Sequence, residues 1–192
     1  MSEIVFGIAL LAVIVIFALS LVQVIKDDFE FWPPPNATSW QHKAFRALFR
    51  VFFICLLVLS VTGFHPGSIG RYLLGAVLLT IGFGFALNWT GFLGWKNAFG
   101  EAAGLKTMGP FAVSRNPIYV VSIVGMVGWA ILVGSWFLST LLSIWACLYI
   151  AAPFLEELWM KENYGEEFVN YAADVPRFGS PAALKGFILS QL

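Results

Sequence analysis

The chain alternates between long apolar stretches and short polar or proline-containing segments. A bilayer core of roughly 30 Å needs about 20 helical residues, each adding about 1.5 Å. The first apolar stretch is too long for the core of a signal peptide, so we expect it to remain as a spanning helix. The pattern predicts an all-α integral membrane protein with five transmembrane helices, at residues 4–25, 46–64, 69–92, 117–133 and 136–152.

Prolines and glycines mark the limits of these helices. Three consecutive prolines at 33–35 exclude a helix between the first and second spans, because proline lacks a backbone donor. Pro153, with acidic residues in the turn that follows it, predicts the start of a new helix. We therefore expect a charged C-terminal segment at 153–192, which is broken at Gly165 and ends in a surface helix over 182–192.

Small residues predict where a helix can approach a neighbouring helix closely. Gly82, Ala86 and Thr90 recur every four residues and form one narrow face of the third helix. Gly125 and Gly128 lie in the fourth helix. Small side chains at a helix interface in a membrane let the two backbones pack closely. The connection between the fourth and fifth helices is two residues long, which predicts a tight antiparallel hairpin.

Composition and charge agree with a membrane protein of one domain, residues 1–192. Hydrophobic residues make up 59% of the chain and charged residues 11%, whereas a soluble domain has about 25% charged residues. The net charge is zero, so nothing indicates nucleic acid as a partner. Cys55 and Cys147 lie in apolar stretches, and His42 and His65 fall on opposite sides of the membrane. We expect neither a disulfide nor a metal site.

The distribution of basic residues predicts an orientation. With five spans, ten of the eleven lysines and arginines lie on one side of the membrane, and Arg71 lies alone on the other. Such an excess marks the cytoplasmic side. We therefore expect the N-terminus outside, with the C-terminus and every candidate functional residue at the cytoplasmic face.

The stretch 109–119 leads into the fourth helix and contains one cation. Arg115 lies between Pro110 and Pro117, beside a helix N-terminus that itself favours anions, so Arg115 is a candidate anion clamp. The alternative is an anchor to lipid head groups. Pro117 suits the first position of a helix, and Asn116 is a candidate N-terminal cap.

Two adjacent acids, Glu156 and Glu157, follow the fifth helix. Adjacent helical residues point about 100° apart, so we expect only one of the two to face a site well. The alternative is that both complement a helix dipole. Tyr119 and Tyr171 have the positions of interfacial tyrosines. Our hypothesis is that the stretch 109–119 and the two acids meet on one face of the membrane and form one small site.

Four short motifs, taken in order, resemble those of one enzyme family. They are Arg-Asn-Pro-Ile-Tyr at 115–119, Glu-Glu at 156–157, Tyr-Gly-Glu-Glu-Phe at 164–168 followed by Tyr171, and Val-Pro-Arg-Phe at 175–178. This set resembles the membrane-embedded methyltransferases of the isoprenylcysteine carboxyl methyltransferase and phospholipid methyltransferase group. The resemblance covers roughly residues 104–178. The size and the five-helix form are similar to those of an archaeal or bacterial member.

The resemblance implies S-adenosylmethionine as methyl donor, S-adenosylhomocysteine as product, and the carboxylate of a prenylated cysteine as acceptor. It implies catalytic roles for Arg115, Glu156 and Glu157. It also implies a cytosolic cofactor pocket lined by Ala103, Gly104, Leu105, Lys106, Phe111, Asn116, Pro117, Ile118 and Tyr119. The lipid or prenylated peptide that accepts the methyl group would enter sideways from the bilayer.

Three positions depart from the pattern of this family. Asn116 stands where a histidine is usual, and Phe111 stands where a tyrosine is usual. Residues 150–153 contain no cation, whereas the eukaryotic carboxyl methyltransferases have an arginine there that is credited with holding the substrate. The departures concern the acceptor more than the donor.

The chemistry leaves two acceptors open. A carboxylate is ionised at neutral pH, so it needs alignment and removal of water rather than a general base. A lipid amine, the acceptor of a phospholipid N-methyltransferase, must first lose a proton, which Glu157 could accept.

Two further classes of protein compete with a methyltransferase. One is a sterol-type reductase, which binds NADPH and has a similar Arg-Asn-Pro-x-Tyr stretch. The second is a small transporter or scaffold without enzymatic activity. No ionisable residue lies at mid-membrane in a predicted helix, which disfavours a transporter.

Overall fold

The computed structural model describes residues 1–26, 28–36 and 38–180, and this part of the chain is helical and contains no strand. Four helices are long and apolar enough to cross a membrane: α1 (Ser2–Ile25), α2 (Trp40–Thr62), α3 (Ile69–Leu93) and α6 (Trp136–Asp174). A shorter apolar helix, α5, covers Pro117–Val133. The all-helical class is thus confirmed for the described residues, and the crossing of the membrane by α5 stays a prediction.

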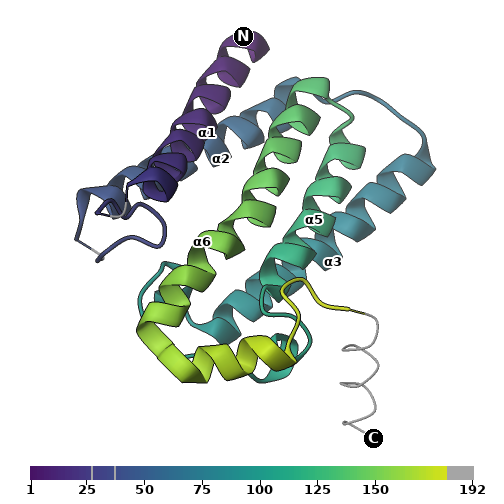
Figure 1. Ribbon diagram of the computed structural model, residues 1–192. Helices are drawn as coiled ribbons and strands as arrows, with labels where there is room; N and C mark the ends of the chain where they lie inside the picture. Colours follow the sequence, from purple (N-terminus) through teal and green to yellow (C-terminus); the bar gives the residue numbers. More distant parts are fainter. Residues whose placement is uncertain (27, 37, 181–192) are drawn as a thin grey trace, which may run out of the picture.

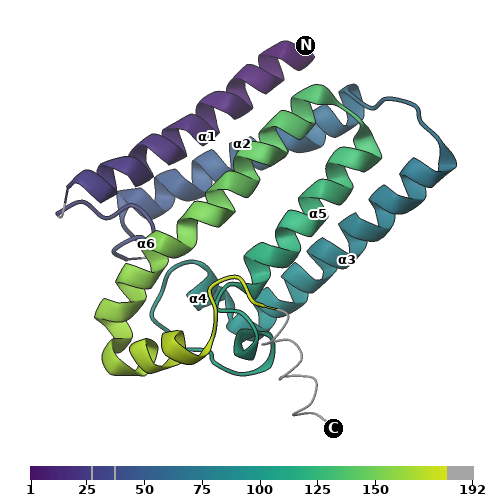
Figure 2. The same ribbon diagram turned by 45° about the vertical axis from the view of Figure 1, so that its right-hand side comes forward.

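The long helices form two pairs, with α6 between them (Figure 1 and Figure 2). In one pair α1 packs along α2, in the other α3 packs along α5, and α6 contacts α1, α2 and α5. Gly134 ends α5 with a φ of 71°, a left-handed conformation that glycine adopts without strain. Since α6 begins at Trp136, the predicted tight hairpin between these two helices is confirmed.

The contact between α3 and α5 depends on glycine. A Cβ atom on Gly82 would lie 2.2 Å from the backbone nitrogen of Gly125, and one on Gly128 would lie 2.3 Å from that of Leu79. No side chain fits at such distances, so the two backbones pack directly against each other. Ala86, one turn further along α3, is buried. The predicted small-residue interface is confirmed.

The hydrophobic core lies where α1, α2, α5 and α6 meet. Phe52 and Leu59 of α2 and Leu138 and Leu141 of α6 are buried. The ring of Trp145 lies edge-on to that of Phe52, with 5.8 Å between their centroids, an arrangement that aromatic pairs prefer. These contacts fix the rotation of α6 about its axis, and with it the directions in which the later residues of α6 point.

The C-terminal part of α6 corrects one prediction. The expected helix start at Pro153 is wrong, because α6 continues through Pro153 to Asp174. Pro153 is fully buried, and packing against neighbouring helices offsets the backbone hydrogen bond that proline cannot make. The break at Gly165 is confirmed by its φ of 53° and ψ of −129°. Near this break α6 turns and runs across the end of the bundle (Figure 1).

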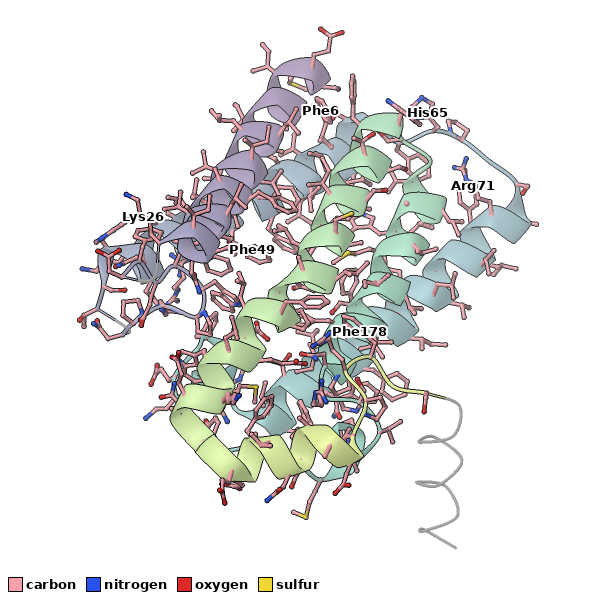
Figure 3. All side chains as sticks on the ribbon, in the orientation of Figure 1. Phe6, Lys26, Phe49, His65, Arg71 and Phe178 are labelled. Atoms are coloured by element: carbon pink, nitrogen blue, oxygen red, sulfur yellow. The ribbon has the colours of Figure 1, made fainter. Side chains whose placement is uncertain are left out.

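The length of α6 shows that part of it extends past the apolar layer. Its 39 residues would span about 58 Å if straight, whereas a bilayer core measures roughly 30 Å. α6 is therefore longer than a single crossing of the bilayer core requires. His65 and Arg71 lie together at one end of the bundle, away from Phe178 (Figure 3). The helix predicted over 182–192 lies outside the described residues.

The segment between α3 and α5 contains two short helical elements. It contains one helical turn, α4 (Trp95–Ala98), and a 3-10 helix, η1 (Gly109–Ala112). The side chain of Asn97 organises it: Nδ2 donates to the carbonyl of Gly104 at 3.0 Å, and Oδ1 accepts from the amide of Ala103 at 2.9 Å. Elements of a single turn show no hydrophobic period, so the sequence pattern did not reveal them.

Candidate functional site

The stretch before α5 and the C-terminal part of α6 meet at one carboxylate, that of Glu157. Nη2 of Arg115 lies 2.9 Å from its Oε1, and Nη2 of Arg177 lies 2.6 Å from its Oε2. Nη1 of Arg115 also donates to the carbonyls of Ala172, at 2.7 Å, and Val175, at 2.8 Å. The predicted meeting of the two segments is therefore confirmed.

Backbone hydrogen bonds join the same segments. The amide of Arg115 donates to the carbonyl of Pro176 at 3.0 Å, and the amide of Asn116 donates to that of Arg177 at 3.1 Å. Ser114 Oγ and Asn116 Nδ2 both donate to this Arg177 carbonyl at 3.1 Å. Asn116 occupies the predicted N-cap position of α5, but its side chain makes no capping hydrogen bond. Its amide group donates to the carbonyl of Arg177 instead.

The negative charge on Glu157 is balanced by the two arginines bound to it. Its side chain is 16% exposed and that of Arg115 is 12% exposed. Burial alone would raise the pKa of the Glu157 carboxyl, but the hydrogen bonds and charges of Arg177 and Arg115 outweigh burial and hold this pKa below its ordinary value. Glu157 is therefore ionised at neutral pH and bound to two guanidinium groups.

Glu156 points away from this junction, in agreement with the rotation between adjacent helical residues. Its Oε1 accepts a hydrogen bond from the indole Nε1 of Trp32 at 2.6 Å, and a second from the hydroxyl of Tyr119. Glu156 lines a cavity of the protein, and Glu157 does not line it. Of the two acids, Glu156 is the one in position to contact a ligand there.

This cavity has a volume of about 360 Å³, which lies in the usual range for small-molecule sites, about 300–1,000 Å³. Arg115 lines it together with Glu156. Ala103 and Leu105, two of the predicted cofactor residues, are not part of its lining. The other seven predicted cofactor residues line it: Gly104, Lys106, Phe111, Asn116, Pro117, Ile118 and Tyr119. The functions assigned to all of these residues stay predictions.

Aromatic rings form much of the cavity wall near Glu156. The ring centroids of Tyr119 and Tyr149 lie 4.6 Å apart, and those of Trp145 and Tyr149 lie 5.5 Å apart. Aromatic faces and carboxylates both attract cations. The arrangement suits a ligand that carries a positive charge within an otherwise apolar body. In the described chain, no cluster of His, Cys, Asp and Glu is arranged to hold a metal ion.

Sequence reasoning missed the cavity wall that comes from the N-terminal part of the chain. Trp32, Phe45 and Phe49 all line the cavity. Nothing in the sequence connects Trp32 with Glu156, because 124 residues separate them. The wall is therefore a product of tertiary packing alone.

A second contact that sequence reasoning missed joins the end of α6 to the segment before α5. Tyr171, expected as an interfacial tyrosine, is buried and donates its hydroxyl to the carbonyl of Phe111 at 2.7 Å. Burial raises the pKa of this hydroxyl above its ordinary value. Both residues line the cavity, so the bond ties the 3-10 helix η1 to the end of α6.

Apolar helices long enough to cross a membrane indicate a multi-pass membrane protein, and a largely apolar cavity lies near one end of them. Residues 70–167 match the family model of the phospholipid methyltransferases. The chain belongs to this family, which includes the isoprenylcysteine and the phospholipid methyltransferases. The resemblance found in the sequence is thereby confirmed.

One curated relative is the nickel-cobalt-cadmium resistance protein NccN of Alcaligenes xylosoxydans xylosoxydans. The two chains are 30% identical over 136 residues, which cover 68% of this chain and 62% of NccN. The chain therefore spans less than two thirds of the length of that relative. No solved structure matches the chain. Arg115, Tyr119 and the two acids lie within the residues that match the family, whereas Trp32 and Arg177 lie outside them.

Proposed function

We propose that the protein is an S-adenosylmethionine-dependent methyltransferase that acts on a lipophilic acceptor at the membrane. The observation that carries this proposal is the cavity shared by Glu156, the aromatic rings and seven predicted cofactor residues. Family membership favours methyl transfer over a sterol-type reductase, a transporter or a scaffold. Methyltransferases of this family generally use S-adenosylmethionine.

The part of the cavity between the α3–α5 segment and α6 suits the donor. Lys106 and Asn116 supply polar groups there, and Trp159 and Tyr164 supply aromatic rings. Lys106 would attract the amino-acid carboxylate of the donor, and the rings would stack on its adenine. When bound, the donor supplies an activated methyl group on a sulfonium. Glu156 and the neighbouring rings would stabilise a positive charge at that position.

Arg115 and Glu157 have a different role in this proposal, which is to hold the stretch before α5 against the C-terminal part of α6. Nε, Nη1 and Nη2 of Arg115 each donate to a protein oxygen. Glu157 in turn binds both Arg115 and Arg177. This geometry supports positioning of the 114–116 stretch. The anion clamp predicted for Arg115 is a separate role, and it stays a prediction.

The first candidate acceptor is the carboxylate of a prenylated cysteine, which needs alignment and removal of water. One observation favours the second candidate, a lipid amine: the acid that lines the cavity is Glu156, whereas Glu157 is bound to two arginines. A carboxylate at that position repels an acceptor carboxylate. It can, however, accept the proton that an ammonium must lose to become a nucleophile. For a lipid amine, the proton acceptor would therefore be Glu156 rather than Glu157.

The proposal places the site at the cytoplasmic face of a protein with five spans and an external N-terminus. Its support is the excess of basic residues on the side of the cavity. The lipophilic acceptor would enter from the bilayer, past apolar side chains that α1 and α2 contribute to the cavity, among them Ile16, Phe17 and Phe49.

Binding and turnover test this proposal separately. Titration calorimetry in detergent should show that the wild type binds S-adenosylhomocysteine, and Lys106→Ala should bind it about tenfold more weakly. Lys161→Ala, which removes an exposed lysine from α6, is the matched control. Methyl transfer from labelled donor should then be measured with prenylcysteine and phosphatidylethanolamine analogues as competing acceptors. A wild type that does not bind the donor product would refute the proposed function.

A further inference from the structure

We infer that Trp32, fixed in place by Gln23, is a positioning residue that sets the carboxylate of Glu156 in the methyl-transfer site. This inference rests on the proposed function and adds to it a residue from outside the part of the chain that matches the family. Three observations support it: the hydrogen bonds from Gln23 to the Trp32 backbone, the stacking of the indole on Phe45, and the hydrogen bond from the indole to Glu156.

The side chain of Gln23, near the end of α1, forms hydrogen bonds with the backbone of the following loop. Its Oε1 accepts from the amides of Phe31 and Trp32, both at 2.7 Å. Its Nε2 donates to the carbonyl of Trp32 at 2.9 Å. One side chain thus satisfies both backbone groups of Trp32, in a loop whose prolines make regular secondary structure impossible.

The indole ring of Trp32 also packs against another aromatic ring. It stacks on Phe45 of α2, with 4.3 Å between ring centroids and 28° between ring planes. Phe31, the preceding residue, is fully buried. With the backbone bound by Gln23 and the ring stacked, the direction of the indole N–H is fixed.

That N–H donates to Oε1 of Glu156 at 2.6 Å. A hydrogen bond to a charged group is shorter and stronger than one between neutral groups. Tyr119 of α5 donates to the same oxygen. Glu156 is therefore held from α5 and from the α1–α2 loop at once, and both donors line the cavity.

The loop is further tied to the proposed donor side of the cavity. A Cβ atom on Gly100 would lie 2.7 Å from Cδ of Pro34 and 2.9 Å from Cβ of Pro33. Gly100 has a φ of 84°, so glycine is suited both to the conformation and to the close contact. The position of Trp32 is thus set by two neighbouring segments, and its indole bond to α6 ends on the acid in the cavity.

The test separates positioning of Glu156 from support of the loop. Trp32→Phe keeps a ring that can stack on Phe45 and removes the N–H. We expect its affinity for S-adenosylhomocysteine to stay within about twofold of wild type and its kcat to fall about tenfold or more, as for the loss of one bond to a charged group. Trp40→Phe, at a 56% exposed position next to the same loop, is the matched control and should keep the wild-type kcat.

Two Gln23 variants extend the test to the side chain that holds the loop. Gln23→Met removes all three hydrogen bonds, whereas Gln23→Glu keeps the acceptor for the two amides. We expect kcat to decrease from wild type to Gln23→Glu to Gln23→Met. Equal kcat values in all three proteins would overturn the role assigned to Gln23.

A second readout does not depend on activity. In the NMR spectrum of nitrogen-15-labelled protein without donor, the indole signal lost in Trp32→Phe should shift in Glu156→Gln. An unshifted signal, or a wild-type kcat in Trp32→Phe, would overturn the inference while leaving the proposed function standing. Failure of the wild type to bind the donor product would instead refute the proposed function itself.

Discussion

The construction of the site is tested most directly by Glu157→Gln, which keeps the shape of the side chain and removes its charge. Glu157 accepts N–H groups from Arg115 at 2.9 and 3.2 Å, and from Arg177 at 2.6 and 2.7 Å. Glutamine has one acceptor oxygen instead of two, and it turns an NH₂ group toward one of the arginines. Both guanidinium groups would then lie next to a neutral side chain.

The expected cost follows from the exposure of the three side chains. Removing one partner of a buried ion pair costs about 3–5 kcal/mol, whereas an exposed pair contributes about 0–1 kcal/mol. Glu157 and Arg115 are largely buried, and Arg177 is 32% exposed. We therefore expect Glu157→Gln to lower the free energy of unfolding by about 2–3 kcal/mol, between these two limits.

Equilibrium unfolding in mixed micelles measures this loss, with Glu162→Gln, an exposed acid on the same helix, as the matched control. Double-mutant cycles of Glu157→Gln with Arg115→Met and with Arg177→Met should give coupling energies of about 1–3 kcal/mol. The coupling should be larger for Arg115, which is less exposed. If Glu157→Gln is as stable as Glu162→Gln and the coupling is zero, the carboxylate does not hold the two segments together and the reasoning fails.

Two further predictions concern pH and helix packing. The folded-state pKa of Glu157 lies below its ordinary value of 4.5, so its stabilisation is complete above that pH and is lost as the pH falls through the folded-state pKa. Unfolding midpoints measured below about pH 5 should therefore decline more steeply in wild type than in Glu157→Gln; equal declines would contradict the assignment. Gly82→Ala should separate α3 from α5 and destabilise the fold, since its Cβ would meet the backbone of Gly125, whereas Gly84→Ala, which meets nothing within 4 Å, should not. Thermal unfolding in detergent compares the two variants, and equal melting temperatures would contradict the direct packing of the backbones.

The helices themselves could be predicted because their signals are local. The predicted and observed limits of α5 agree at Pro117 and Val133, since a proline begins this helix and a left-handed glycine follows it. The small residues on α3 and α5 likewise indicated the interface that the structure contains. These features depend on backbone conformation and side-chain size, which the sequence states directly.

The continuation of α6 through Pro153 was not predictable from local signals. The directions in which Glu156 and Glu157 point could therefore not be predicted relative to the residues before Pro153. Trp145, Tyr149 and Glu156 lie at positions i, i+4 and i+11 of one helix, which place them on one face. Trp145 is buried in the core, so an unbroken helix would have pointed Glu156 toward the same side as Tyr149. The predicted break at Pro153 removed that relation, and only the packing of Pro153 against its neighbours restores it.

The two adjacent acids illustrate why a site of this kind needs both local pattern and tertiary structure. One rotation of about 100° directs Glu157 to two arginines that join the cavity walls, and directs Glu156 to Trp32 and Tyr119 within the cavity. Loss of the first charge should weaken the fold and the donor site together. Loss of the second should leave the fold intact and impair turnover, because Trp32 is also held by Gln23 and Phe45, and the ring of Tyr119 also packs on Tyr149. A pair of variants, Glu156→Gln and Glu157→Gln, that lost stability and turnover to the same extent would show that this division between neighbouring residues is wrong.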